Sequence, residues 1–219
     1  MQAQREEGAV INWLSPHAYL QDPLWWEIYE SSFPEEERDQ KHHFSRALKY
    51  NNVKMGACYF QGKMIGIVVV YFMESLPFAF LHYFSIHPDF RRLGLGSLFF
   101  QKIMQDVELM LKKNHAEHLG MIWEIEDYSY ANDDVEKNLK LSRLGFYIRN
   151  DAKLLNIKFI QPAILNCIVP MLLMHHHSDP MLNISAFEYD IAKAIYLEKY
   201  HSVNEIPKKT LLKLLKKTL

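Results

Sequence analysis

A short turn rich in glycine and arginine carries the clearest chemistry in this 219-residue sequence. It reads RRLGLGS, residues 91–97, and it joins an apolar strand-like run to a helical pattern. The first N–H groups of a helix lack partners within the helix, and the helix dipole adds about half a positive charge there. Gly94 and Gly96 permit positive φ and close approach of a ligand, while Arg91 and Arg92 offer donors for phosphate oxygens. Together these residues predict a pyrophosphate-binding turn.

Other nucleotide-binding motifs fit this turn less well. A Walker loop is excluded, because no Gly-Lys-Ser or Gly-Lys-Thr follows, and a dinucleotide fingerprint would need its third glycine at Phe99. Two glycines alone are also typical of a tight strand–helix turn in which they satisfy only backbone geometry. The strand before the turn, the arginines and the helix after it favour the anion-binding interpretation.

The residues around this turn resemble a known motif. The segment IHPDFRRLGLGSLFF, residues 86–100, is similar to the acetyl-CoA-binding motif of the GCN5-related N-acetyltransferases, the GNAT superfamily. The family pattern Gln/Arg-x-x-Gly-x-Gly/Ala is met by Arg91, Gly94 and Gly96. The downstream segment SRLGF resembles the helix-ending LGF that follows the family's fifth strand. The order of predicted elements over residues 9–160 matches this fold, and SSFPEEER resembles a bacterial branch of the family.

The resemblance implies an α/β (α+β) fold with a mixed, mostly antiparallel central sheet flanked by helices, in which the fourth and fifth strands splay apart like a V. The pantetheine arm of acetyl-CoA would enter this gap and pair with the fourth strand, and the amides of the turn would hold the pyrophosphate. No metal is implied. The acetyl-CoA-binding residues implied in this way are Phe84, Ser85, Ile86, Arg91, Arg92, Leu93, Gly94, Leu95, Gly96 and Ser97.

The implied reaction is acyl transfer from acetyl-CoA to a primary amine by direct attack in a ternary complex. An amine of the lysine type, with a pKa of about 10.4, is almost wholly protonated at pH 7, so a base must remove a proton. In the predicted fifth strand, MIWEIED, Glu124 and Glu126 share one face because side chains alternate along a strand. Glu124 matches the fifth-strand carboxylate of several family members and is the predicted base. A solvated edge carboxylate is the alternative.

The sequence departs from the family at the expected proton donor. Many members carry a tyrosine five residues before the phenylalanine of LGF, where this chain has Leu141, which cannot donate a proton. Tyr128 and Tyr130 follow the predicted fifth strand, and Tyr128 is the second catalytic candidate beside Glu124. Half-buried packing is the alternative role for such tyrosines. Leu141 also motivates a second hypothesis, a non-catalytic acyl-CoA-binding sensor or interaction module with a degenerate site.

Composition limits the partners and the compartment. A formal net charge of -1 argues against nucleic-acid binding. Cys58 and Cys167 do not form a disulfide framework and suit a reducing cytosol. With no signal-peptide pattern and no apolar run of about 20 residues, a cytoplasmic protein is expected. The amine acceptor stays open among a small amine, an aminoglycoside-like polyamine and a protein amino group.

One domain is expected. Residues 1–160 would form the acyl-CoA-binding core, and residues 161–219 would supply the strands and helices that complete or extend it. The tail KKTLLKLLKKTL predicts a basic amphipathic helix that packs on its own domain or on a second copy, as in a homodimer, rather than on an anionic membrane. The predicted apolar face of this helix holds Leu211, Leu212, Leu215 and Leu219.

Several helix boundaries are also predicted. Ser32 and Glu35 have capping-box spacing and indicate a helix whose first turn holds the carboxylates of residues 35–39. Attraction of a cationic acceptor is the alternative role of these carboxylates. Further along the chain, one helix is expected to begin at Ser97 and another to end at Gly145.

Two runs of histidine are interpreted as exposed positions. The runs are His42–His43 and His175–His177. Neighbouring side chains in a strand or loop point in different directions and rarely converge on one ion, so a metal site is not predicted at either run.

Overall fold

The computed structural model describes residues 8–13, 16–50, 52–162, 169–179 and 181–218, so that Cys167 and Leu219 lie outside the described residues. The strands are β1 (Ala9–Asn12), β2 (Val53–Phe60), β3 (Lys63–Phe72), β4 (Ala79–Ile86), β5 (Met121–Glu126), β6 (Lys153–Leu154), β7 (Phe159–Gln161) and β8 (Val169–His176). The α-helices are α2 (Pro16–Leu20), α3 (Pro23–Ser32), α4 (Lys41–Lys49), α5 (Leu95–Asn114), α6 (Asp134–Ile148), α7 (Glu188–Ala194) and α8 (Lys208–Leu215). Short 3-10 turns are η1 (Glu35–Glu37), η2 (Pro88–Phe90), η3 (Tyr128–Tyr130) and η4 (Ile184–Phe187), and η5 (Ile195–His201) is π-helical.

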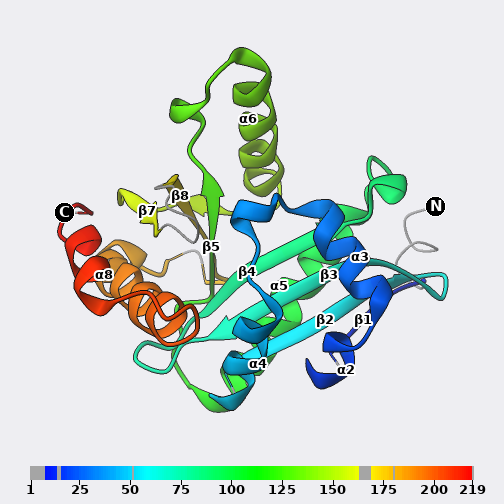
Figure 1. Cartoon of the computed structure of the whole chain (residues 1–219), viewed down its shortest axis with the longest axis horizontal. Helices are drawn as coiled ribbons and strands as arrows, with labels where there is room; N and C mark the ends of the chain where they lie inside the picture. The colour runs from blue at the N-terminus through cyan, green and yellow to red at the C-terminus, as the bar shows by residue number, and fades with distance from the viewer. Residues whose placement is uncertain (1–7, 14–15, 51, 163–168, 180, 219) are drawn as a thin grey trace.

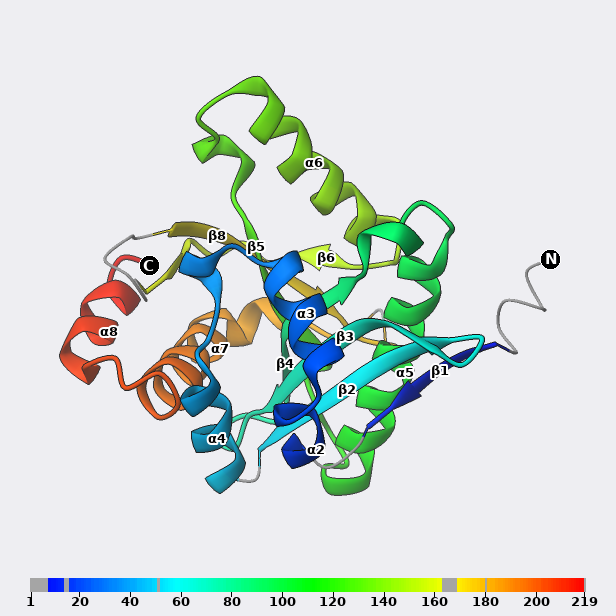
Figure 2. The same cartoon turned by 45° about the vertical axis from the view of Figure 1, so that its right-hand side comes forward.

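The strands form one mixed sheet in the order β1-β2-β3-β4-β5-β8-β6, and β7 also pairs with β8. The β4–β5 pair is parallel, and the other pairs recorded among the described residues are antiparallel. Figures 1 and 2 show α2, α3 and α4 on one face of the sheet and α5 on the opposite face. The predicted mixed, mostly antiparallel sheet flanked by helices is confirmed.

Side-chain alternation on the central strands explains the two layers of helices. On β3, Ile67, Val69 and Tyr71 are fully buried in a cluster with α3, α4 and the C-terminal helices. Val68 and Val70 point the other way and are fully buried with α5. Burial on both faces is typical of a central strand, and each such side chain contributes about 1.5–3 kcal/mol of transfer free energy. The apolar core therefore lies on both sides of the sheet.

Local signals explain how the first elements form. The hairpin between β2 and β3 turns at Gln61 and Gly62, whose φ values are 51° and 77°. Two left-handed residues are typical of a tight hairpin turn that matches the twist of its strands. The side chain of Asp22 accepts hydrogen bonds from two amides of the first turn of α3, and Pro23 occupies the first helical position. Both features are favourable at a helix N-terminus.

The predicted capping box is wrong. Ser32 is the last residue of α3, and Glu35 begins the separate 3-10 turn η1. Helix α4 begins only at Lys41, where Gln40 and His43 form a reciprocal capping box. The acidic stretch therefore lies in the connection between two helices rather than in the first turn of one.

The predicted end of α6 is also wrong. The helix continues through Gly145 to Ile148. Phe146 and Tyr147 pack against the apolar cluster on the α5 side of the sheet. Tertiary packing of this kind supplies most of the stability of a helix in a protein, and here it outweighs the helix-ending preference of glycine.

The histidine runs are only partly exposed. His42 is exposed as predicted, but His43 and His175 are buried. His175 lies in β8 and is 4% exposed, with its Nε2 atom 2.8 Å from the backbone oxygen of Leu119. His43 lies in α4 and is also buried. Among the described residues, no group of three His, Cys, Asp or Glu side chains is arranged to hold a metal ion.

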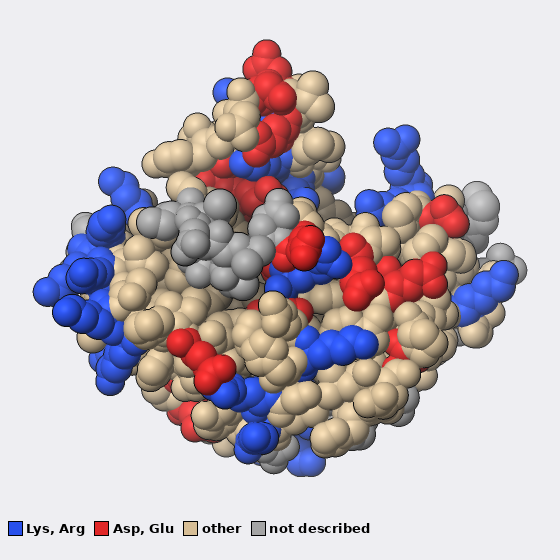
Figure 3. Space-filling model, in the orientation of Figure 1, with Lys and Arg blue, Asp and Glu red and all other residues tan. Residues whose placement is uncertain are grey.

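The C-terminal helix α8 packs on its own chain. Leu211, Leu214 and Leu215 are buried in the core cluster beside α7 and η5. The predicted face is wrong at one position, because Leu212 is 38% exposed and Leu214 takes its place. Figure 3 shows Lys and Arg side chains gathered over α8, on the outer side of the molecule. Within the described ranges, no helix combines the length and apolar character needed to cross a bilayer.

Candidate active site

The fourth and fifth strands splay apart at a defined point. Their parallel pairing ends at Leu81↔Trp123, and no later pair between them is recorded in the described part of the chain. His82 is the extra residue of a β-bulge, because its neighbours Leu81 and Tyr83 pair with consecutive residues of β3. A bulge bends its strand and increases the local twist. Strand β4 therefore turns away from β5 beyond His82, and the predicted V-shaped splay is confirmed (Figure 1).

A cavity of about 540 Å³ lies in this fork. Its walls come from β4, β5, α6 and the connection between α3 and α4. From β4 it is lined by Phe84, Ser85 and Ile86, and from β5 by Glu124 and Glu126. Cavities of this size are typical of small-molecule sites.

The glycine-arginine turn forms one rim of the cavity. Gly94 has a φ of 79° and precedes α5, which begins at Leu95 rather than at the predicted Ser97. A Cβ atom on Gly96 would lie 3.5 Å from Cε2 of Phe146, which is ordinary van der Waals contact. The backbone therefore requires glycine at position 94, whereas Gly96 supplies open space beside the cavity.

The structure brings the other predicted acetyl-CoA-binding residues to the same end of the fork. The Nε atom of Arg91 donates a hydrogen bond to the backbone oxygen of Ile86 at 2.8 Å, so this arginine ties the end of β4 to the turn. Arg92 has a left-handed φ of 63°, and it lies with Leu93 on the exposed side of the turn. The first turn of α5 holds Leu95, Gly96 and Ser97. Their binding roles stay predictions.

Glu124 lies at the closed end of the fork, one residue beyond the last β4–β5 pair. Its two carboxylate oxygens accept hydrogen bonds from the hydroxyl of Tyr200 at 2.9 and 3.0 Å. Burial raises the pKa of Glu124 to about 8, against this hydrogen bond and the charge of Lys199, which lower it. A general base is most effective when its pKa lies near the working pH. Strand β5 lies inside the sheet, between β4 and β8, and Glu124 is held by Tyr200. Both observations favour Glu124 as a general base over Glu124 as a solvated edge carboxylate.

Helix α6 forms the opposite wall of the cavity. Its lining residues are Leu139, Ser142, Arg143, Phe146 and Tyr147. Arg143 forms an ion pair with Glu126 across the opening. Leu141, the position at which the family places a tyrosine, is not among the lining residues that the structure describes. Tyr147 is the tyrosine that α6 presents instead, and burial raises its pKa to about 12, so that it keeps its proton.

Tyr128, the second predicted catalytic residue, lies in η3 before α6. It is not one of the described residues that line the cavity, and its neighbour Tyr130 is 64% exposed. The tyrosine in contact with Glu124 is Tyr200. The catalytic role of Tyr128 stays a prediction.

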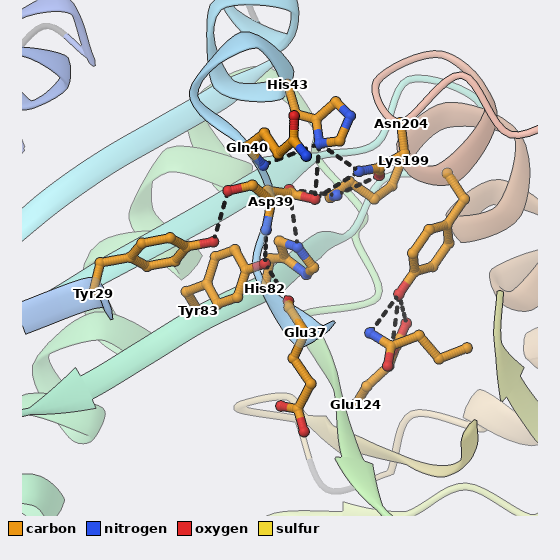
Figure 4. A network of polar contacts seen from close by, with 12 residues as sticks. Tyr29, Glu37, Asp39, Gln40, His43, His82, Tyr83, Glu124, Lys199 and Asn204 are labelled. Atoms are coloured by element: carbon orange, nitrogen blue, oxygen red, sulfur yellow. Dashed lines mark hydrogen bonds and ion pairs between the residues drawn. The ribbon is translucent and has the colours of Figure 1, made fainter. Parts of the chain in front are cut away.

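A buried charged cluster adjoins the fork (Figure 4). The side chains of Asp39 and Lys199 are fully buried, and Oδ2 and Nζ lie 2.8 Å apart. Nε2 of His82 lies 3.2 Å from the same oxygen. The other carboxylate oxygen, Oδ1, accepts a hydrogen bond from the side-chain amide of Asn204 at 2.6 Å and lies 3.5 Å from Nδ1 of His43. Burial opposes the ionisation of Asp39, but Lys199, His82 and His43 together outweigh it and hold the pKa of Asp39 well below its usual value. The cluster thus ties β4 to the C-terminal helices.

Acid should weaken the fold through His82. Burial and the charge of Lys199 lower the pKa of His82 from 6.5 to about 4, although Asp39 raises it. The unfolded chain takes up this proton near pH 6.5 and the folded chain only near pH 4, so the contribution to stability is present above pH 6.5 and is lost as the pH falls. We expect the free energy of unfolding, measured by urea titration, to fall by roughly 3 kcal/mol between pH 6.5 and pH 4 because of His82.

A histidine substitution checks this assignment. His82→Gln should show a shallower loss of stability between pH 7 and pH 4, whereas the same change at the exposed His42 should leave the slope unchanged. Equal slopes for the two variants would contradict the role of His82.

Sequence reasoning missed His82, Lys199 and Tyr200. One signal was present in the segment IYLEKYH, where Lys199 falls on the same buried face as Ile195 and Tyr196. A lysine on an apolar face is almost never fully buried unless it is paired, so it predicts an acidic partner elsewhere in the chain. The acidic stretch supplies that partner in Asp39, while Glu37 lines the cavity.

The model of a family described as the Acetyltransferase (GNAT) family matches residues 21–130. Among curated proteins, no match to the chain is found.

Solved structures share the fold. A GNAT-family acetyltransferase from Bacteroides thetaiotaomicron is 17% identical, with a TM-score of 0.68 and coverage of 86% of this chain and 96% of its own. A spermidine N-acetyltransferase from Vibrio cholerae is 8% identical, with a TM-score of 0.57 and coverage of 82% and 99%. The Arabidopsis thaliana protein NAA60, solved with acetyl-CoA, is 10% identical, with a TM-score of 0.55 and coverage of 77% and 97%. At these identities the likeness concerns the fold.

Proposed function

The chain belongs to the GNAT acetyltransferase family, and on this premise we propose that it transfers an acetyl group from acetyl-CoA to a primary amine. The observation that carries the proposal is the position of Glu124 at the closed end of a cavity of about 540 Å³, whose rim is the turn before α5. One end of the cavity thus offers amides for an anion and the other offers a base.

Acetyl-CoA fits the open end of the fork. Beyond Leu81 the β5-facing edge of β4 has no recorded β5 partner in the described residues, so the backbone of residues 84–86 can pair with the amides of a pantetheine arm. The N-terminal amides of α5 face the same end and suit the pyrophosphate, helped by the left-handed Gly94. When bound, acetyl-CoA supplies the activated acyl group. The protein supplies position and proton transfer.

Glu124 would take the proton from the attacking amine. With its pKa raised to about 8, the carboxylate of Glu124 is basic enough to accept that proton and becomes the dominant form above about pH 8. Glu37 also lines the cavity, so the amine would enter a partly acidic space. The acceptor is therefore proposed to be a primary amine that arrives as a cation and reacts as the neutral base.

The test is saturable binding of acetyl-CoA by calorimetry, with Gly94→Val as the probe. A β-branched side chain in the left-handed region costs about 1–2 kcal/mol of folding stability. At position 94 it would also crowd the amides proposed to hold the pyrophosphate, so we expect about tenfold weaker binding. Gly62→Val is the matched control, because Gly62 has a φ of 77° in the hairpin turn and a Cβ there meets nothing within 4 Å. The control should lose similar stability and keep its affinity.

Turnover decides between the enzyme and the alternative. Release of the CoA thiol with a panel of primary amines is expected for the proposed transferase. Tight binding of acetyl-CoA with no thiol release across the panel would contradict it and would leave a non-catalytic acyl-CoA-binding module. Absence of any binding would overturn both.

A further inference from the structure

Two consecutive residues of η5 bridge the fork between β4 and β5. Lys199 reaches the β4 side, where its Nζ atom lies 2.8 Å from Oδ2 of Asp39, and His82 Nε2 lies 3.2 Å from the same oxygen. Tyr200 reaches the β5 side and donates to Glu124 at 2.9 Å. His82 and Glu124 each follow directly on the last β4–β5 pair. The C-terminal segment therefore closes the fork at the place where the strands separate.

The π-helical turn brings both side chains to the sheet. The backbone oxygen of Lys199 accepts a hydrogen bond from the amide of Asn204, five residues later, at 3.2 Å. Lys199 and Tyr200 are both fully buried although they are adjacent in sequence. Such turns are rare and are found frequently at functional sites.

The hydroxyl group of Tyr200 donates its hydrogen bond to the carboxylate of Glu124. The side-chain amide of Gln161 donates to the hydroxyl oxygen at 3.2 Å, so the hydroxyl hydrogen is available to the carboxylate. The oxygen lies 2.9 and 3.0 Å from the two carboxylate oxygens and is thus centred between them. A buried ring held by Gln161 on β7 therefore fixes the position of the Glu124 carboxylate.

We propose that Tyr200 is a positioning residue that holds the carboxylate of Glu124 toward the cavity, and that Lys199 anchors this tyrosine through Asp39. The inference rests on the proposed function, because it assigns a partner to the proposed base. It also extends the site beyond residues 21–130, the part that matches the family, into the C-terminal part of the chain.

The charged groups that face Glu124 come from two parts of the chain. Lys199 on η5 favours the ionised carboxyl group, whereas Asp39 and Glu37, between α3 and α4, oppose it. The hydrogen bond from Tyr200 also favours the ionised form. Removing the hydroxyl while these charges stay in place should raise the pKa of Glu124 further.

The experiment measures kcat/KM against pH for Tyr200→Phe and for the unchanged protein, with acetyl-CoA and one accepted amine. A hydrogen bond to a charged group is worth about one pKa unit or more. The rise of kcat/KM with pH that reports ionisation of Glu124, here called the acid limb, should therefore move up by about one pH unit. The variant should then be about tenfold slower at pH 7 and should converge on the unchanged protein at high pH. The ratio of the two profiles cancels titration of the acceptor. A ratio that stays constant across the pH range would overturn the inference.

Tyr196→Phe is the matched control. Tyr196 lies in the same buried segment, but its hydroxyl donates to the backbone oxygen of Ile160 at 2.8 Å. This variant should lose thermal stability, and its kcat/KM should rise over the same pH range as that of the unchanged protein. Should Tyr200→Phe fail to fold, Gln161→Met removes the N–H that orients Tyr200 and should shift the limb in the same direction by a smaller amount.

Two outcomes separate this inference from the proposed function. If Glu124→Gln is inactive and neither Tyr200→Phe nor Gln161→Met shifts the limb, only the positioning role fails. If Glu124→Gln keeps full activity at every pH, the proposed base itself fails.

Discussion

Replacing Glu124 by glutamine should lower kcat/KM for an amine acceptor by about 10²–10⁴-fold at pH 8, which is the usual contribution of a general base. Glutamine keeps the shape of the side chain and cannot take up the proton. The unchanged protein should gain activity as the pH rises through about 8, because the carboxylate is then the dominant form. The variant should lack this rise in activity near pH 8. The difference in kcat/KM between the variant and the unchanged protein should become smaller toward pH 10, where more of the amine is already neutral.

Glu126→Gln provides the comparison for this result. Glu126 lies on the same face of β5 and also lines the cavity, but it is paired with Arg143 rather than held by Tyr200. Initial rates of thiol release should fall far less in this variant, and calorimetry should give unchanged acetyl-CoA affinity for both. Equal losses in the two variants would remove Glu124 from the proposed role.

Replacing Lys199 by methionine should destabilise the protein by about 3–5 kcal/mol, since it leaves the fully buried Asp39 without its ammonium partner. Methionine retains most of the side-chain volume, so the loss comes from the uncompensated charge rather than from a cavity. Urea unfolding at pH 7 measures the effect. Adding Asp39→Asn should recover much of the loss, because the buried charge is then removed together with its partner.

A surface ion pair between neighbouring segments gives the control. Arg46 on α4 pairs with Glu205 at 2.5 Å, with side chains 35% and 54% exposed. Arg46→Met should cost less than about 1 kcal/mol, because water screens exposed pairs. A similar loss for Arg46→Met and Lys199→Met would mean that burial does not govern the strength of the Asp39 pair.

Those parts of the site that depend on local sequence could be predicted. A glycine directly before a helix favours a left-handed turn, and Gly94 adopts one. Alternation along a strand places Glu124 and Glu126 on one face, and both line the cavity. The boundaries were less predictable, because packing of Phe146 and Tyr147 carries α6 past its glycine.

The partners of the proposed base could not be predicted, because they come from distant parts of the chain. Asp39 and Lys199 are separated by 160 positions, and Glu124 and Tyr200 by 76. A helical pattern says which residues share a face but not which strand that face meets. The π-helical turn also breaks the regular period at Lys199 and Tyr200. The bulge at His82 likewise depends on pairing with β3 and leaves no mark in the apolar run.

The strand that covers the outer edge of β5 lies late in the chain, because β8 spans Val169–His176. This strand pairs with β5 along Met121–Glu126 and separates it from β6. During synthesis, the outer edge of β5 emerges well before the segment that covers it, and an uncovered edge is a template for association with strands of other chains. Chains that end before Val169 should therefore collect as aggregates that recruit holdase chaperones, instead of folding as a smaller independent unit.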